Sequence, residues 1–133
     1  RFGSPGFVHV VDCQTLAYPE YRGNGVFASL GNMFENPHIG IVFVDFFDTT
    51  VGLHVNGVAT SHHLNELPEN LVEHLDTFSI EADSMVQRWV TVSIDEAYIH
   101  CSKHVPLLSK QTKQIQWGTD DPVAKSTDYF EAS

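Results

Sequence analysis

A glycine-rich stretch, Tyr21-Arg22-Gly23-Asn24-Gly25, carries the clearest chemical signal in the sequence, because it leads directly into a predicted helix. Glycines leave backbone N–H groups accessible, and the start of a helix adds a partial positive charge. Arg22 adds a bidentate donor that matches phosphate oxygens, and Ser29 and Asn32 add neutral donors from the first helical turns. These residues predict a phosphate site. A glycine-rich surface turn with a solvated arginine is the alternative, since the stretch matches neither a Walker nor a Rossmann motif.

The histidines are a second set of side chains that could do chemistry, and the chain contains eight of them. His62 with His63, or His100 with Cys101 and His104, are candidate ligands for zinc or iron. Neighbouring residues such as His100 and Cys101 point to opposite faces of a strand, and the adjacent histidines lie in a polar stretch where solvent exposure explains them more simply. We therefore predict no metal site.

Side chains arranged for nucleophilic or acid–base catalysis are not recognisable. Ser29 lacks a His and Asp pair in any motif, and Cys101 lacks an electropositive neighbourhood beyond Lys103. Asp45 and Asp48 form a carboxylate pair, but they lie at predicted strand ends, where a structural role is the simpler explanation. The catalytic residues therefore stay unassigned.

The elements that must position these residues are mainly strands. Alternating β-branched and aromatic residues predict strands, and apolar residues at helical spacing predict a helix over Val26–Glu35 that ends before Pro37. One or two further helical turns are expected over Pro68–Leu75. The predicted strands are Phe7–Val11, Leu16–Tyr18, Ile39–Phe47, Val51–Ala59, Val86–Ile94 and Ala97–Cys101, with a loop over Pro19–Gly25 and a hairpin turn over Asp48–Thr50. This pattern favours a mainly β fold, a small β-barrel with short helices.

The length of 133 residues fits a single domain over residues 1–133. After Lys103 the chain turns polar, so residues 104–133 are expected to form a C-terminal arm without a core of its own. The chain starts at Arg1 without a Met and enters a strand almost at once, which leaves open whether N-terminal strands of the domain precede it.

The charge balance restricts the partners. Seven basic against 17 acidic residues give a net charge of −10, which disfavours nucleic acids and anionic membranes. The longest apolar run, Ile41–Val44, is far too short to cross a bilayer. Cys13 and Cys101 show no paired spacing, and no leader segment is recognisable, so we expect a reduced, cytoplasmic setting.

The order of strands, glycine-rich loop and helix resembles the pyridoxamine 5′-phosphate oxidase-like flavoproteins, which are FMN-binding split barrels. The resemblance covers roughly Phe7–Lys103, about three quarters of the chain. It is carried by Tyr21-Arg22-Gly23-Asn24 with Ser29-Leu30-Gly31-Asn32, and then by Glu35-Asn36-Pro37 and Asn56-Gly57. It implies FMN as the cofactor and a homodimer that completes the flavin groove. Haem-handling split barrels belong to the same broad superfamily.

The resemblance also implies which residues contact the cofactor. Those along the isoalloxazine edge would be Val8, His9, Val10 and Val11. Tyr18 would close the ribityl side, His54 would add a polar contact, and Trp117 would cover the ring from the partner subunit. Those at the phosphate would be Arg22, Gly23, Asn24, Ser29 and Asn32.

Departures from the family pattern narrow the expected activity. Asp12 stands where the oxidase usually has a basic residue, and Ala28-Ser29 stand where its helix carries Arg and Lys. The basic, tryptophan-containing C-terminal motif of the oxidase is also missing. We therefore expect not the oxidase proper but a flavin-dependent oxidoreductase acting on an unidentified small-molecule substrate. The alternatives are a protein that stores or senses FMN without turnover, and a split barrel that binds deazaflavin or haem.

Overall fold

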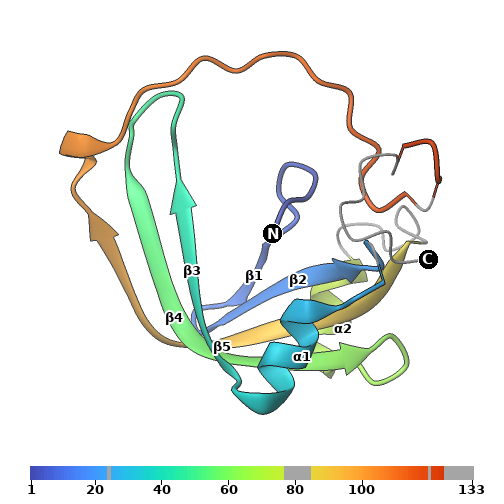
Figure 1. The fold of residues 1–133 in the computed structure, drawn as a ribbon. Helices are drawn as coiled ribbons and strands as arrows, with labels where there is room; N and C mark the ends of the chain where they lie inside the picture. The colour runs from blue at the N-terminus through green and yellow to red at the C-terminus, as the bar shows by residue number, and fades with distance from the viewer. Residues whose placement is uncertain (24, 77–84, 120, 125–133) are drawn as a thin grey trace.

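Five antiparallel strands form one curved sheet in the order β1-β2-β5-β4-β3 (Figure 1). The computed structural model describes residues 1–23, 25–76, 85–119 and 121–124. The strands are β1 (His9–Asp12), β2 (Thr15–Tyr21), β3 (His38–Val44), β4 (Gly52–His63) and β5 (Val86–His100). Two helices, α1 (Ala28–Glu35) and α2 (Glu69–Asp76), and the 3-10 turn η2 (Ser102–His104) complete the described elements. The predicted mainly β class with short helices is confirmed.

Two hydrophobic cores lie on opposite faces of the sheet, because successive side chains of a strand alternate between its faces. Along β2, Leu16 and Tyr18 enter the inner core, whereas Ala17 enters the outer one. Helix α1 covers the inner core with Leu30 and Met33. Helix α2 covers the outer core, whose buried members are Ala17, Leu71, Leu75, Val86 and Trp89. The two short helices thus occupy opposite faces of the sheet.

Strand β2 is longer than predicted and includes Pro19, which we expected in a loop. Proline cannot donate a backbone hydrogen bond, so it is tolerated in a strand where one side needs no donor. The pairing with β1 stops at Ala17, and beyond that point β2 pairs with β5 alone, Pro19 opposite Trp89. The edge position therefore explains why the strand continues through a proline.

Strand β5 is one continuous element of 15 residues, whereas two strands separated by Asp95 and Glu96 were predicted. The register against β4 shifts between Asn56 and Gly57, a bulge that lets the chain bend without ending the strand. At Gly57 an added Cβ would collide with the carbonyl oxygen of Ser93. Close backbone contact therefore requires glycine at this bend.

The β3–β4 connection is longer than the predicted hairpin turn, and β3 ends at Val44 rather than at Phe47. The Asp45 carboxylate accepts hydrogen bonds from the backbone N–H groups of Phe47 at 3.0 Å and Thr49 at 2.8 Å. These bonds stabilise the charged form and lower the Asp45 pKa to about 2. An aspartate-centred turn therefore replaces the end of the predicted strand.

Helix α1 begins two residues later than predicted. Phe27 has a φ of 51°, in the left-handed region, and Gly25 has a φ of 80°. The Gly25 N–H donates to the Arg22 carbonyl oxygen at 2.9 Å, so the glycine-rich stretch forms a tight turn before the helix. The predicted helix over Pro68–Leu75 corresponds to α2, shifted by one residue.

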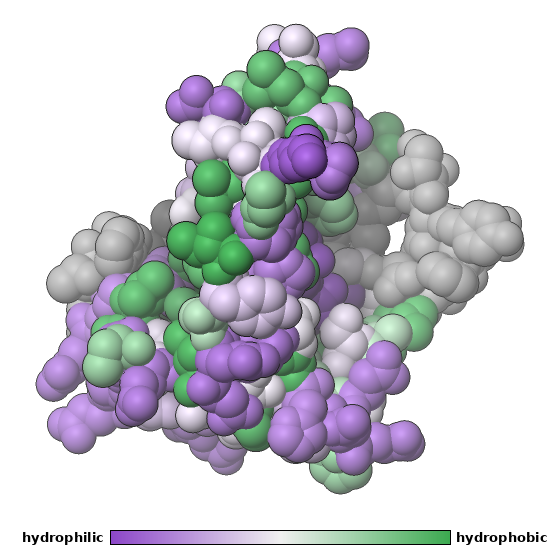
Figure 2. All heavy atoms as spheres, turned by 90° about the vertical axis from the view of Figure 1, so that its left-hand side faces the viewer, coloured by the Kyte–Doolittle hydropathy of each residue, from purple (hydrophilic) through white to green (hydrophobic). Residues whose placement is uncertain are grey.

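The segment after η2 crosses the top of the molecule in Figure 1 as an extended strap. Residues 105–119 and 121–124 contain no helix or strand. Leu108 anchors the strap to the β3–β4 connection, where its N–H donates to the Phe46 carbonyl oxygen at 2.7 Å. Figure 2 views the side with η2 and the ends of β4 and β5, where apolar and polar side chains are interspersed. In the described ranges no helix combines the length and the apolar character that crossing a membrane requires.

Candidate functional site

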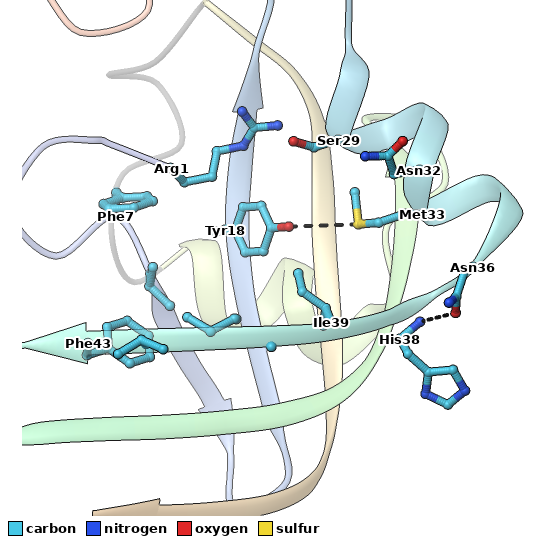
Figure 3. Close-up of a pocket in the computed structure, with 14 residues that line it drawn as sticks. Arg1, Phe7, Tyr18, Ser29, Asn32, Met33, Asn36, His38, Ile39 and Phe43 are labelled. Atoms are coloured by element: carbon cyan, nitrogen blue, oxygen red, sulfur yellow. Dashed lines mark hydrogen bonds between the residues drawn. The ribbon is translucent and has the colours of Figure 1, made fainter. Parts of the chain in front are cut away.

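A pocket of about 500 Å³ opens between α1, β2, β3 and the N-terminal segment (Figure 3). It lies at the inner core, on the side of the sheet that α1 covers. The residues that line it are Arg1, Phe7, Val8, Tyr18, Ser29, Asn32, Met33, Asn36, His38, Ile39, Gly40, Ile41, Val42 and Phe43.

Apolar and polar side chains line different parts of the pocket. Ile39 and Phe43 lie along β3, and Phe7 lies near Arg1 on the N-terminal segment (Figure 3). Toward α1, the Arg1 guanidinium lies beside the side chains of Ser29 and Asn32 (Figure 3). A flat apolar ligand with one anionic substituent matches this division, because the ring would be desolvated and the charge would meet donors.

Tyr18 and Met33 face each other at the centre of the pocket (Figure 3). The Tyr18 hydroxyl donates to the Met33 sulfur at 3.9 Å. Burial raises the Tyr18 pKa above its ordinary value of 10.0, an effect that the Arg1 charge partly opposes. Tyr18 is therefore a neutral hydrogen-bond donor at neutral pH. The ring of His38, by contrast, points away from the pocket (Figure 3).

Four residues of the predicted FMN set line this pocket, namely Val8, Tyr18, Ser29 and Asn32. Their convergence follows from the fold, since α1 packs over the inner face of β2. The roles that the resemblance assigns to them stay predictions.

Other residues of that set lie elsewhere. Arg22 and Gly23 are exposed in the turn before α1 and do not line the pocket, and Asn24 lies outside the described residues. Trp117 is partly buried beside Gly118, where an added Cβ would lie 2.7 Å from the Tyr21 ring. Within one chain, the structure separates these residues from the pocket.

Strand alternation explains the positions of the residues next to Val8. His9 packs against His74 and Trp89 on the α2 side, with ring centroids 5.6 and 5.4 Å away. Val11 packs against the outer core, and Val10 is 66% exposed. His54 does not line the pocket either, and it stacks on Tyr98 instead.

An ion pair between Arg1 and Glu20 was not predicted from the sequence. Glu20 is only 3% exposed, and among the described residues its Oε2 atom has no hydrogen-bond partner. Burial raises the Glu20 pKa, and the Arg1 charge opposes this shift. Had β2 been predicted to continue through Pro19, strand alternation would have predicted Glu20 on the inner face with Leu16 and Tyr18. Nothing in the sequence indicated Arg1, because the two residues lie 19 positions apart.

Comparison with known proteins supports the fold. No protein-family model matches the chain, and no curated protein matches it. Among solved structures, it is similar to a histidine-to-alanine variant of HupZ from Group A Streptococcus that carries V5 and polyhistidine tags. The TM-score is 0.56 with 17% identity, over 71% of this chain and 73% of that one. The fold is thus split-barrel-like, as predicted. Membership of the oxidase-like family stays a prediction.

Proposed function

We propose that this chain binds haem in the pocket between α1 and β3, as a binding protein without catalytic side chains. The observation that carries the proposal is the pair Tyr18 and Met33, facing each other among apolar walls. Tyrosine and methionine are both side chains that ligate haem iron in proteins. Haem-handling proteins also occur among split barrels, as the resemblance implied.

The pocket residues fit the chemical demands of haem. The apolar side chains of Phe7, Ile39 and Phe43 would desolvate the macrocycle. Arg1, which also pairs with Glu20, would pair with a propionate through its remaining donors. Met33 is the better candidate ligand, because the raised pKa of Tyr18 disfavours the phenolate. Tyr18 would then orient the Met33 thioether through its hydroxyl. Haem would supply redox-active iron, and the protein would supply binding and orientation.

Titration of the tag-free chain with hemin tests this proposal through the Soret band. We expect Met33→Leu to shift the band and to weaken binding about tenfold or more, because the thioether is lost while the shape is nearly kept. Met85→Leu is the matched control, since Met85 directly precedes β5 and does not line the pocket. Identical titrations of Met33→Leu and wild type would contradict the proposal.

FMN is the second candidate ligand, because Val8, Tyr18, Ser29 and Asn32 converge on the same pocket. In this case Arg1 is the cation that lies beside Ser29 and Asn32. We expect Arg1→Ala to weaken FMN binding by about 2 kcal/mol while leaving riboflavin binding nearly unchanged. Arg22→Ala distinguishes the two possible locations of the FMN phosphate. A phosphate at the predicted glycine-rich stretch would depend on Arg22, and a phosphate in the pocket would depend on Arg1. An oxidoreductase would further need the bound flavin to turn over faster than free FMN.

A further inference from the structure

Two histidines from distant parts of the chain meet on the face of the sheet opposite the pocket. His54 on β4 pairs in register with Tyr98 on β5, and His100 pairs with Gly52. The Nε2 atom of His54 lies 2.7 Å from the Nδ1 atom of His100. Neither histidine lines the pocket. This pair is therefore separate from the site described above.

Their neighbours hold both rings in place. Tyr98 stacks on His54 with ring centroids 4.8 Å apart and an interplanar angle of 3°. The His100 ring lies directly over Gly52, where an added Cβ would collide with the ring atoms, Nε2 among them. A side chain at position 52 is thus incompatible with this placement of His100. The arrangement positions two imidazole nitrogens toward each other from adjacent strands.

We propose that His54 and His100 form a binding site for a divalent first-row transition-metal ion such as Zn²⁺ or Cu²⁺. Imidazole nitrogen is a preferred ligand of both ions. Two nitrogens that bind one tetrahedral zinc are about 3.3 Å apart, so the 2.7 Å separation has to widen by about 0.6 Å. Both rings also have to turn, so that their lone pairs point at the ion and not at each other. When both rings are neutral, the bridging proton moves to an outer ring nitrogen, and binding releases no net proton. Water would complete the coordination.

The surroundings favour a cation over an anion. The next cross-strand pair on this face is Asn56 with Glu96, whose carboxylate accepts from the Asn56 amide at 2.7 Å. The chain as a whole carries a net charge of −10. Such a charge concentrates cations near the surface. Among the described residues no group of three or more His, Cys, Asp or Glu could hold a metal ion, so the proposed site is a two-ligand one.

Titration of the tag-free full chain with Zn²⁺ against a colorimetric chelator tests the site. We expect one ion per chain to bind, with His54→Ala and His100→Ala each weakening it at least tenfold. Gly52→Ala is the sharpest variant, because it keeps both histidines but displaces the His100 ring, and we expect the same loss. His62→Ala and His104→Ala are matched controls that should bind as wild type does.

Cu²⁺ provides a readout that does not depend on affinity, because electron paramagnetic resonance shows hyperfine coupling to ligating nitrogens. Coupling to two nitrogens in wild type and to fewer in His54→Ala is expected. Zinc binding by the His54→Ala, His100→Ala double variant at wild-type affinity would overturn the proposal. Wild-type protein that binds neither ion would also overturn it, and the hydrogen bond between the rings would then be purely structural. Circular dichroism of each variant separates loss of the site from loss of the fold.

Discussion

At the scale of single residues, Glu20 is unusual because its carboxylate is buried beside the pocket with Arg1 as its partner. Desolvation raises its pKa above the ordinary 4.5, and the Arg1 charge opposes this. The folded state therefore holds the Glu20 proton more tightly than the unfolded state does.

This buried carboxylate makes stability depend on pH. The contribution of protonated Glu20 is fully present below the unfolded pKa of 4.5 and is lost as the pH rises through the raised folded pKa. We expect Glu20→Gln to have the higher free energy of unfolding at neutral pH, with the difference becoming smaller toward about pH 4. Urea unfolding of both proteins across this range measures it. A difference that does not vary with pH would contradict the assignment.

His9 affects the pH dependence of stability in the opposite direction. Burial, and secondarily the charge of His74, lower the His9 pKa below 6.5. The folded state therefore disfavours protonated His9, and stability falls as the pH drops through 6.5 toward the lower folded pKa. His62 contributes in the same direction, since burial and Arg88 lower its pKa. We expect His9→Gln to lose less stability than wild type between about pH 7.5 and 5.5 in urea unfolding, and equal losses would refute the prediction.

At the scale of elements, the bend in β4 and β5 depends on the bulge at Gly57. A Cβ there would collide with the Ser93 carbonyl oxygen, which cannot move without breaking the sheet. We expect Gly57→Ala to lower the free energy of unfolding by roughly 1–3 kcal/mol. Gly31→Ala is the contrasting variant, because an added Cβ at this position of α1 would have no atom outside the local helix backbone within 4 Å. We expect it to stabilise the protein by roughly 0.5–1 kcal/mol. Thermal melts of the two proteins should shift in opposite directions, and a shift in the same direction would contradict this account.

Local sequence patterns predicted most elements but not their ends. Helix α1 and the strands follow from apolar spacing, whereas Phe27 in the left-handed region and the Asp45 turn depend on local geometry that spacing does not encode. The continuation of β2 through Pro19 depends on where β1 stops pairing. Of these features, the continuation of β2 is the one that follows from contacts between strands.

The candidate site was predictable to a similar extent. The resemblance to flavin-binding split barrels pointed to Val8, Tyr18, Ser29 and Asn32, and these four residues meet in one pocket. Arg1 and Met33 could not, because their place in the pocket depends on how the N-terminal segment and α1 pack over the sheet. The His54–His100 pair was missed for the same reason, since the two residues lie 46 positions apart.

At the scale of the whole molecule, apolar side chains are exposed along the β3–β4 connection, the start of β4, the end of β5 and the strap. Ile99 is 70% exposed, and Phe47, Leu53 and Leu107 are also exposed. We propose that a second copy of the chain covers part of this surface, in a homodimer of closed symmetry. Sedimentation should then give about twice the chain mass of 14.9 kDa, and Ile99→Asp should shift it toward the monomer. A wild-type monomer at micromolar concentration would contradict this proposal.

A crystal structure of the tag-free chain with hemin would show whether the pocket between α1 and β3 binds haem. We predict haem in contact with Phe7, Ile39 and Phe43, the iron bonded to the Met33 sulfur, and a propionate at Arg1. Haem binding in this pocket would be contradicted by haem bound elsewhere on the chain, or by a pocket that binds FMN and excludes hemin.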